Sequence, residues 1–308
     1  MAGSTTLKLT NRSPKQPIKR LPADIQLPAG ATVEDAKKMI AKAAKIGDHN
    51  RIGLFDTATR KTFKNRQAVL MEIPAVADSS EVLVKDLGPQ IGWRTVFLIE
   101  YFGPILAHCA VVAARPYIYK GGDADMSKTQ WLVFGMFITH FLKREFETAF
   151  IHKFSANTMP FFNVFKNSFF YWAISGVLCA LSVYYPRSLA ARANQPMIDA
   201  AGTALFVFSE TGNALVHYYL STLRSPGSTE RKIPRGYGFG LVTCPNYMFE
   251  IMAWVGIIIA SRDWSVALFI SIGAAQMYVW AKGKERAYRT EFGDKYKKKH
   301  YVILPGLL

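Results

Sequence analysis

Six apolar runs between residues 92 and 281 constrain the fold of this chain more than any other feature of its sequence. A bilayer core is about 30 Å thick, so a helix that crosses it needs about 20 mostly apolar residues. The six runs have roughly this length, and they are 92–114, 131–151, 167–185, 199–221, 239–260 and 264–281. The sequence therefore predicts an α-helical polytopic membrane bundle of about six spans.

Basic residues between the runs predict how the bundle is oriented, because Lys and Arg gather on the cytosolic side of membrane proteins. A cytosolic N-terminus places residues 152–167, residues 224–238 and the basic tail on that side. The loops 115–130 and 186–198 also carry basic residues, although they would lie on the opposite side. On balance we expect an even number of spans, with both termini in the cytosol.

The first part of the chain differs from the rest because it is polar and rich in lysine. Its predicted elements, in ββαββ order, are 6–11, 18–28, 32–46, 51–56 and 79–88. Thr32 is expected to be the N-cap of the helix. The order resembles a ubiquitin-like (β-grasp) fold in its pattern. We therefore expect a ubiquitin-like cytosolic domain at 1–87 and a membrane domain at 88–308.

Charge and cysteine content limit the classes of function. The formal charge of +16 admits nucleic acid, an anionic membrane face or an anionic substrate as partner. The basic residues do not share one face with interleaved aromatic residues, so we expect no nucleic-acid binding. The three cysteines form no CxxC pair, and the histidines form no HxxH or HExxH pair. The sequence therefore predicts neither a disulfide framework nor a metal site.

Charged residues interrupt the second apolar run as a stripe along one helix face. The stripe, spaced i, i+3, i+4 and i+7, consists of His140, Lys143, Arg144 and Glu147. A charge that faces lipid costs at least about 3 kcal/mol, so four on one stripe are untenable unless they face inward. We interpret the stripe as one wall of an internal cavity. The alternative is a cytosolic helix end whose long side chains reach toward water.

Two further runs repeat this arrangement. Their polar residues are Glu210, Asn213, His217 and Arg224 in one run, and Asn246, Tyr247, Glu250 and Trp254 in the other. Three apolar helices that each present one polar stripe indicate a shared, water-accessible pocket. Glu100, in the first run, adds a fourth candidate wall.

A set of basic residues surrounds the predicted cytosolic mouth of this pocket. Its members are Arg224, Arg231, Lys232, Arg235, Lys282, Lys284 and Arg286. Such a collar suits a phosphate-bearing ligand, because guanidinium and ammonium groups bind phosphate oxygens. The alternative is that these charges only set the membrane topology.

Several motifs resemble the steroid 5α-reductase family. They are RKIP, LVTCPNYMFEIMAWVGIIIA and WAKGKERAYRTEFGDKY followed by ILP. The motifs EYFGP, HFLKREFETAFIHKFS and TMPFFNVFKN, with the ubiquitin-like unit, are similar to the very-long-chain trans-2-enoyl-CoA reductase branch. The resemblance covers essentially the whole chain. It implies a multi-pass endoplasmic reticulum enzyme that performs the last reduction of the fatty-acid elongation cycle with NADPH.

The resemblance also implies roles for single residues. The cofactor site would consist of Asn213, Arg224, Lys232, Asn246, Glu250, Lys284 and Tyr288. Tyr247, in the PNY element, matches a catalytic tyrosine, and we expect it to donate the proton to C2 or to hydrogen-bond the thioester oxygen. Glu100, Lys143 and Arg144 fall where the family lines the reacting end of the pocket.

Two departures from the family pattern bear on these roles. Phe141 stands where steroid reductases have a tyrosine. A tyrosine at that position cannot polarise the carbonyl here, so we expect Tyr247 to act instead. Lys232 and Lys284 stand where steroid reductases have Arg and His, so the charge can be kept but bidentate geometry cannot.

Three other functions remain open. A sterol or steroid double-bond reductase would share the fold and cofactor, although Phe141 and the N-terminal unit count against it. A membrane methyltransferase would bind S-adenosylmethionine instead, and a non-enzymatic scaffold would dock through residues 1–86. As partners we expect very-long-chain trans-2-enoyl-CoA, the lipid bilayer and other elongation-cycle enzymes (elongase, ketoreductase and dehydratase).

Overall fold

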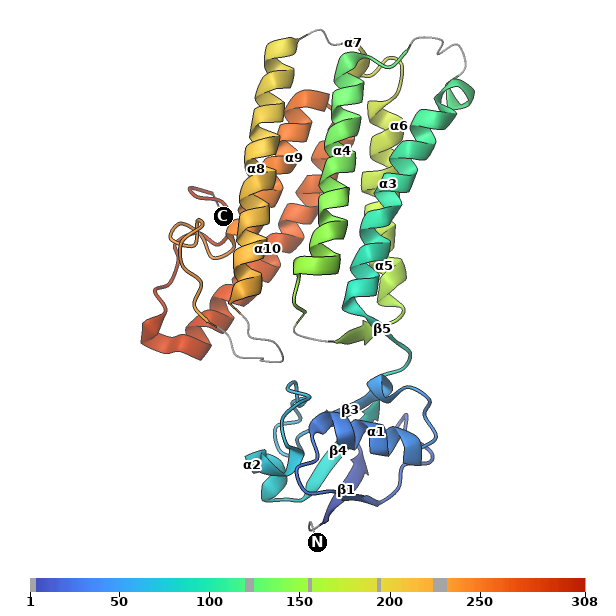
Figure 1. The fold of residues 1–308 in the computed structure, drawn as a ribbon, viewed down its shortest axis with the longest axis vertical. Coiled ribbons are helices and arrows are strands. Elements are labelled where there is room, and N and C mark those ends of the chain that lie inside the picture. Colours follow the sequence, from blue (N-terminus) through green and yellow to red (C-terminus); the bar gives the residue numbers. More distant parts are fainter. Residues whose placement is uncertain (1–3, 120–124, 155–156, 193–194, 224–231, 308) are drawn as a thin grey trace. The chain divides into compact units, whose positions relative to one another are not determined.

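Figure 1 shows the fold as a computed structural model, which describes residues 4–119, 125–154, 157–192, 195–223 and 232–307. The contacts within the chain divide it into two units. The first unit holds the described residues up to Trp93 and those of 154–163, and the second unit holds the other described residues. Each unit is built around a hydrophobic core of its own.

A mixed four-stranded sheet and one long helix form most of the first unit. Its elements are β1 (Thr5–Asn11), β2 (Asp24–Leu27), α1 (Val33–Ala43), β3 (Ile52–Phe55), α2 (Pro74–Ala77) and β4 (Glu81–Asp86), with 3-10 turns at His49–Arg51 and Leu70–Glu72. The strand order is β2-β1-β4-β3, with β1 and β4 parallel and the other neighbours antiparallel. Leu7, Ile40 and Val84 are fully buried in the core. The ββαββ order agrees with the sequence prediction, and the ubiquitin-like designation stays a proposal.

The start of α1 and the length of β2 show local sequence effects. Thr32 Oγ1 accepts the Asp35 N–H at 3.1 Å, and Asp35 Oδ2 accepts the Thr32 N–H at 3.1 Å. This capping box satisfies two N–H groups at the helix start, as the sequence predicts. β2 is shorter than the predicted strand at 18–28, because Pro22 has no N–H to give to a sheet.

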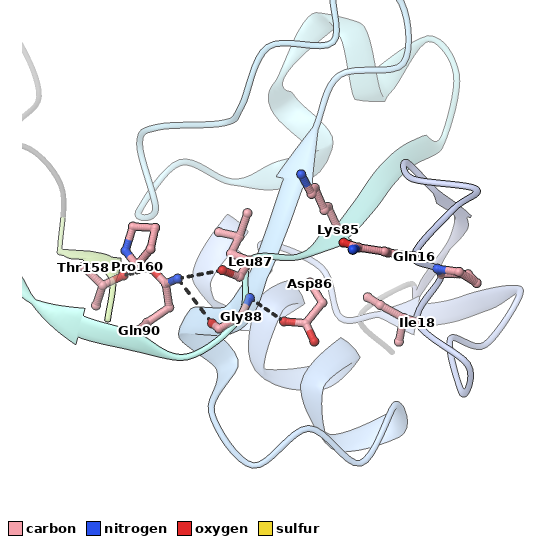
Figure 2. Close-up of a pocket in the computed structure, with 10 residues that line it drawn as sticks. Gln16, Ile18, Lys85, Asp86, Leu87, Gly88, Gln90, Thr158 and Pro160 are labelled. Atoms are coloured by element: carbon pink, nitrogen blue, oxygen red, sulfur yellow. Dashed lines mark hydrogen bonds between the residues drawn. The ribbon is translucent and has the colours of Figure 1, made fainter. Parts of the chain in front are cut away.

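The segment after β4 adds a small second sheet to the first unit. Its antiparallel strands are β5 (Gln90–Gly92) and β6 (Thr158–Pro160). A cavity of about 710 Å³ lies beside it, lined by residues 16–18, 85–88, 90, 158 and 160 (Figure 2). In its wall, Gln90 Nε2 donates to Leu87 O at 3.2 Å, and the Gly88 N–H donates to Asp86 Oδ1 at 2.8 Å. These bonds fix the turn between β4 and β5.

Helices make up the second unit. They are α3 (Trp93–Ile118), α4 (Lys128–Phe146), α5 (Asn163–Phe169), α6 (Cys179–Val183), α7 (Leu189–Arg192), α8 (Pro196–Thr222), α9 (Pro245–Ser261) and α10 (Trp264–Phe292). A π-helical turn at Glu147–Ile151 extends α4, another at Phe170–Leu178 joins α5 to α6, and a 3-10 turn at Gly293–Lys295 follows α10.

Three helical segments of the described chain are long and apolar enough to cross a membrane, namely Trp93–Ile118, Asn163–Val183 and Trp264–Lys295. α4 and α8 are less apolar because they carry polar stripes, and α9 has only 17 residues. The mostly helical membrane fold is therefore confirmed. The count of six spans stays a prediction.

Two helix boundaries differ from the predicted runs. α9 begins at Pro245 rather than at 239, because Gly238 turns the chain with a φ of +90° and Pro245 suits the first position of a helix. α10 continues to Phe292, well beyond 281, because the Lys, Glu and Arg residues that follow favour helix as strongly as apolar residues do.

Glycines bring α8 and α9 into backbone contact. A Cβ on Gly202 would lie 2.7 Å from the Gly256 carbonyl oxygen, and a Cβ on Gly256 would lie 2.7 Å from the Gly202 carbonyl oxygen. Small residues at such positions allow helices to approach closely. α4 packs beside both helices, and Phe137, Phe141 and Trp254 are almost completely buried. The close packing of the three helices therefore brings their polar stripes into contact.

Candidate active site

Three neighbouring helices bring the predicted stripes into one place. α4, α8 and α9 lie side by side in Figure 1 and contact one another. The polar cluster between them consists of His140, Lys143, Arg144, Glu147, Glu210, Asn213, His217, Asn246 and Glu250. His140 is 2% exposed and Glu147 is 1% exposed. The prediction that the α4 stripe faces inward is therefore confirmed.

His140 connects all three helices. Its Nδ1 lies 2.6 Å from Glu210 Oε1 on α8, and its Nε2 lies 3.3 Å from Glu250 Oε1 on α9. The Trp254 indole N–H donates to the same Glu250 oxygen at 3.2 Å. These contacts fix both carboxylates in the interior of the bundle.

Lys143 is the second link between α4 and α8. Its Nζ donates to Glu210 Oε2 at 2.7 Å and to Asn213 Oδ1 at 2.6 Å, and it lies 3.5 Å from Glu147 Oε1. Asn213 Nδ2 donates to the backbone oxygen of Asn246 at 2.8 Å. Three residues of the predicted cofactor site, Asn213, Asn246 and Glu250, are therefore neighbours.

Arg144 forms a second branch of the cluster, at the point where α4 becomes a π-helix. Its Nη1 donates to Glu147 Oε2 at 3.0 Å, and the same oxygen lies 2.9 Å from His217 Nδ1. Its Nη2 donates to the Tyr101 hydroxyl on α3 at 2.9 Å. π-helical turns are frequent at functional sites, because they shift side chains away from regular helical positions.

Groups of opposite charge pair within this cluster. Its carboxylates belong to Glu147, Glu210 and Glu250, and its basic residues are Lys143 and Arg144, each within 4 Å of a carboxylate. Removing one member of a buried ion pair costs about 3–5 kcal/mol, because it leaves an uncompensated charge. The apolar bundle thus tolerates the stripes because their charged groups pair with one another.

Glu100 stands out as a buried carboxyl group that is only partly satisfied. It is 1% exposed, and its Oε1 has no hydrogen-bond partner within the described part of the chain. Arg144 is close enough to act on it electrostatically. An unsatisfied buried polar atom is costly, so in a native site it commonly marks the place of a ligand or water.

Tyr247 lies in the first turn of α9, half-buried beside the cluster. Lys284 Nζ lies 5.6 Å from the centre of its ring, and the Trp280 ring lies 6.5 Å away. The charges of Arg144 and Glu250 also reach it. The predicted catalytic tyrosine is therefore placed next to two other predicted site residues, Lys284 and Asn246.

The remaining predicted cofactor residues are more dispersed. Lys232 is exposed in the segment that leads to α9, and Lys284 is exposed on α10. Tyr288, one turn beyond Lys284, packs against the Tyr296 ring at 5.3 Å. Arg224 and its neighbour in the collar, Arg231, lie outside the described residues. The described members of the basic collar are all exposed, as a phosphate site at an aqueous mouth requires.

One grouping of ligating atoms is not apparent from sequence spacing. Glu147, His152 and His217 each offer a ligand atom, and these atoms lie within 4.8 Å of one another. The Arg144 guanidinium already lies 3.0 Å from Glu147 Oε2 and 3.3 Å from His217 Nδ1. Two of the three groups therefore already contact a guanidinium.

Comparisons with known proteins place this arrangement in a family. The family model of the 3-oxo-5-alpha-steroid 4-dehydrogenases matches residues 157–308. The very-long-chain enoyl-CoA reductase of Dictyostelium discoideum is 38% identical over 293 residues, which cover 91% of this chain and 93% of that protein. The trans-2,3-enoyl-CoA reductase-like protein of Mus musculus is 30% identical over 293 residues, which cover 90% of this chain and 78% of that protein.

The helical fold and its buried polar cluster thus define a membrane reductase of the steroid 5α-reductase type. Within that class, the chain belongs to the very-long-chain enoyl-CoA reductase family. It is an oxidoreductase that acts on carbon–carbon double bonds.

Proposed function

We propose that the chain reduces the 2,3 double bond of very-long-chain trans-2-enoyl-CoA, the last step of the fatty-acid elongation cycle, with NADPH as reductant. The observation that carries this proposal is a buried cluster of paired charged groups inside an apolar helical unit. Such a site lets an acyl chain lie among apolar side chains while its reacting end meets polar groups.

The residues present fit a nicotinamide dinucleotide. Asn213, Asn246 and Glu250 offer amide and carboxylate groups next to one another. Lys232 and Lys284 are exposed ammonium groups that suit phosphates, including the additional phosphate that distinguishes NADPH from NADH. When bound, NADPH supplies the hydride that adds to C3 of the enoyl group.

The side chains of the cluster have the chemistry that the rest of the reaction needs. Negative charge builds on the thioester oxygen, and C2 must receive a proton. We assign one of these tasks to the Tyr247 phenol, as proton donor or as hydrogen-bond donor to the oxygen. Lys143 and Arg144 hold the carboxylates of the cluster in place, and Glu100 lies within electrostatic range of Arg144, so we assign these three to the reacting end.

The setting of the enzyme follows from the same reasoning. We infer an endoplasmic reticulum location, about six spans and cytosolic termini, which agree with the positive-inside rule. We also infer that residues 1–87 form a ubiquitin-like domain in the cytosol. That domain is the part of the chain best suited to contact other elongation-cycle enzymes, because it is outside the membrane.

An assay of the purified protein tests this function. We expect NADPH oxidation on addition of a long-chain trans-2-enoyl-CoA, with one saturated acyl-CoA formed for each NADPH, and a lower rate with NADH. Lys284→Gln should raise KM for NADPH about tenfold, as for the loss of one charge-assisted hydrogen bond. Lys297→Gln, an exposed lysine of the tail, is the matched control and should leave KM unchanged. Reduction of a steroid enone, with no reduction of any enoyl-CoA, would contradict the proposal.

A further inference from the structure

Tyr101 is a buried phenol at the reacting end that neither the sequence motifs nor the family resemblance assign. It follows Glu100 on α3 and is 3% exposed. Arg144 Nη2 donates to its hydroxyl oxygen at 2.9 Å, and the guanidinium carbon lies 5.0 Å from the centre of its ring. The phenol oxygen is therefore in direct contact with a permanent cation.

Within the described part of the chain, the hydroxyl hydrogen of Tyr101 has no acceptor. Because the oxygen accepts the Arg144 N–H, the hydroxyl must direct its hydrogen elsewhere, and among the residues that the structure describes it makes no second hydrogen bond. A buried tyrosine hydroxyl usually finds a hydrogen-bond partner, and a phenol can donate as well as accept. A donor that is left over beside the incompletely satisfied Glu100 points to a ligand atom that accepts a hydrogen bond.

Both Tyr101 and its cation are held rigidly. Glu147 fixes Arg144 at 3.0 Å and is itself held by His217 at 2.9 Å. The Tyr101 ring stacks on Phe97, with centroids 5.8 Å apart, and meets Tyr171 edge-on at 5.3 Å. A donor that is fixed before the reaction stabilises developing charge without a cost of reorganisation.

The position of Tyr101 also relates it to two residues discussed above. Its ring lies 6.4 Å from that of Phe141, which has no hydroxyl to offer at this place. Tyr101 and Arg144 are both near enough to Tyr247 to act on it electrostatically. Two phenols in one region allow a division of labour between the thioester oxygen and C2.

We propose that Tyr101 is a further catalytic residue, whose hydroxyl donates a hydrogen bond to the thioester oxygen of the bound trans-2-enoyl-CoA while Tyr247 protonates C2. This inference rests on the proposed function. Hydride forms the new C3–H bond. The π electrons of the C2–C3 bond then form a C1–C2 double bond, and the π electrons of the carbonyl move onto the oxygen, which gives an enolate. The carbonyl then re-forms as C2 takes the Tyr247 proton. Tyr101 keeps its proton throughout; the substrate gains two electrons, and NADPH loses them.

Tyr101→Phe tests the inference, because it keeps the ring and removes only the hydroxyl. We expect kcat to fall about 10²–10³-fold, as for the loss of one oxyanion-hole donor, with KM for NADPH unchanged. Tyr171→Phe is the matched control, since that ring contacts Tyr101 and its hydroxyl has no assigned role. A Tyr101→Phe enzyme with wild-type turnover, or one whose loss equals that of Tyr171→Phe, would overturn the inference.

A second measurement separates catalysis from folding. 3,5-Difluorotyrosine at position 101 keeps the ring and the hydroxyl but makes the phenol more acidic. The high-pH limb of the kcat profile should then move to lower pH, because the donor loses its proton earlier. An unmoved limb would assign Tyr101 a packing role only. Wild-type protein that reduces no enoyl-CoA refutes the proposed function itself, whereas active wild type with an unaffected Tyr101→Phe refutes this inference alone.

Discussion

The two units of this chain contain ion pairs that differ in burial. In the first unit Arg51 pairs with Asp86 at side-chain exposures of 35% and 29%, and the core holds apolar residues such as Leu7 and Ile40. In the second unit Glu147 pairs with Arg144 at 1% and 14% exposure, deep between helices. An exposed pair costs little to form and contributes little, whereas a buried pair requires desolvation of both partners. Charge that is buried at such a cost indicates a site rather than a stabilising device.

The largest effect should follow from the smallest chemical change in the second unit. Tyr247→Phe removes one hydroxyl, and we expect kcat to fall about 10²–10⁴-fold while NADPH still binds, because an acid–base group is lost. Steady-state kinetics with a cofactor-binding assay measures both. The control is Tyr218→Phe on α8, an exposed tyrosine that should behave as wild type. Near-normal turnover of Tyr247→Phe would remove its catalytic role.

Removing one charge in each unit sharpens the contrast in stability. Glu147→Ala leaves Arg144 and His217 without their shared carboxylate, so we expect a loss of about 3–5 kcal/mol in the free energy of unfolding. Asp86→Asn removes the partly exposed partner of Arg51 and should cost less than about 1 kcal/mol. Denaturant unfolding in detergent compares the two variants. Equal losses would mean that burial does not distinguish the two pairs.

The contact between α8 and α9 can be tested by a variant that changes no charged residue. Gly256→Ala places a Cβ 2.7 Å from the Gly202 carbonyl oxygen, so α8 and α9 must separate, at a cost of about 1–3 kcal/mol. Gly273→Ala on α10 is the matched control, because its nearest neighbour would be 3.9 Å away. Thermal unfolding should show a lower Tm for Gly256→Ala alone. A Tm that is unchanged would show that the backbones are not in contact.

The smallest effect is expected in acid, in the first unit. The hydrogen bond from Arg51 lowers the pKa of Asp86 below its ordinary value. The unfolded chain, with an Asp pKa of about 3.9, therefore takes up the proton first, so the pair stabilises the fold above about pH 4 and this contribution is lost as pH falls through the lower folded pKa. Solvent screening keeps the effect below about 1 kcal/mol.

Hydrogen exchange of β3 and β4 in the intact chain measures this contribution. Asp86→Asn should flatten the acid dependence of protection, whereas Asp78→Asn, an exposed acid that serves as control, should keep the wild-type profile. Identical profiles for wild type and Asp86→Asn would show that the pair adds nothing.

The site could be predicted from sequence as far as helical periodicity reaches. A spacing of three and four residues places His140, Lys143 and Glu147 on one face regardless of tertiary structure. Apolar flanks then require that face to turn inward. The pairing between stripes could not be predicted in this way, since His140 and its partner Glu210 are 70 positions apart and nothing local fixes their contact.

Tyr101 shows a second limit of sequence reasoning. In the sequence, a tyrosine in an apolar run cannot be told from one that only packs. Its contact with Arg144, which lies on another helix, is what suggests a role for its hydroxyl. The start of α9 was also out of reach of hydropathy, because residues 239–244 are apolar enough to extend the run although Gly238 and Pro245 define a turn before it. Hydropathy reports burial, whereas helix ends depend on backbone geometry.

Isotope tracing tests the central claim most directly, that the buried cluster reduces the 2,3 double bond of an enoyl-CoA. Purified protein is given a long-chain trans-2-enoyl-CoA with NADPH deuterated at its transferable C4 position, and the product is analysed by mass spectrometry. The account predicts a saturated acyl-CoA with deuterium at C3 and a solvent-derived hydrogen at C2. The Tyr218→Phe variant should form this product at the wild-type rate, and the Tyr247→Phe variant should form it far more slowly. Product without deuterium at C3, or equal rates for the two variants, would contradict it.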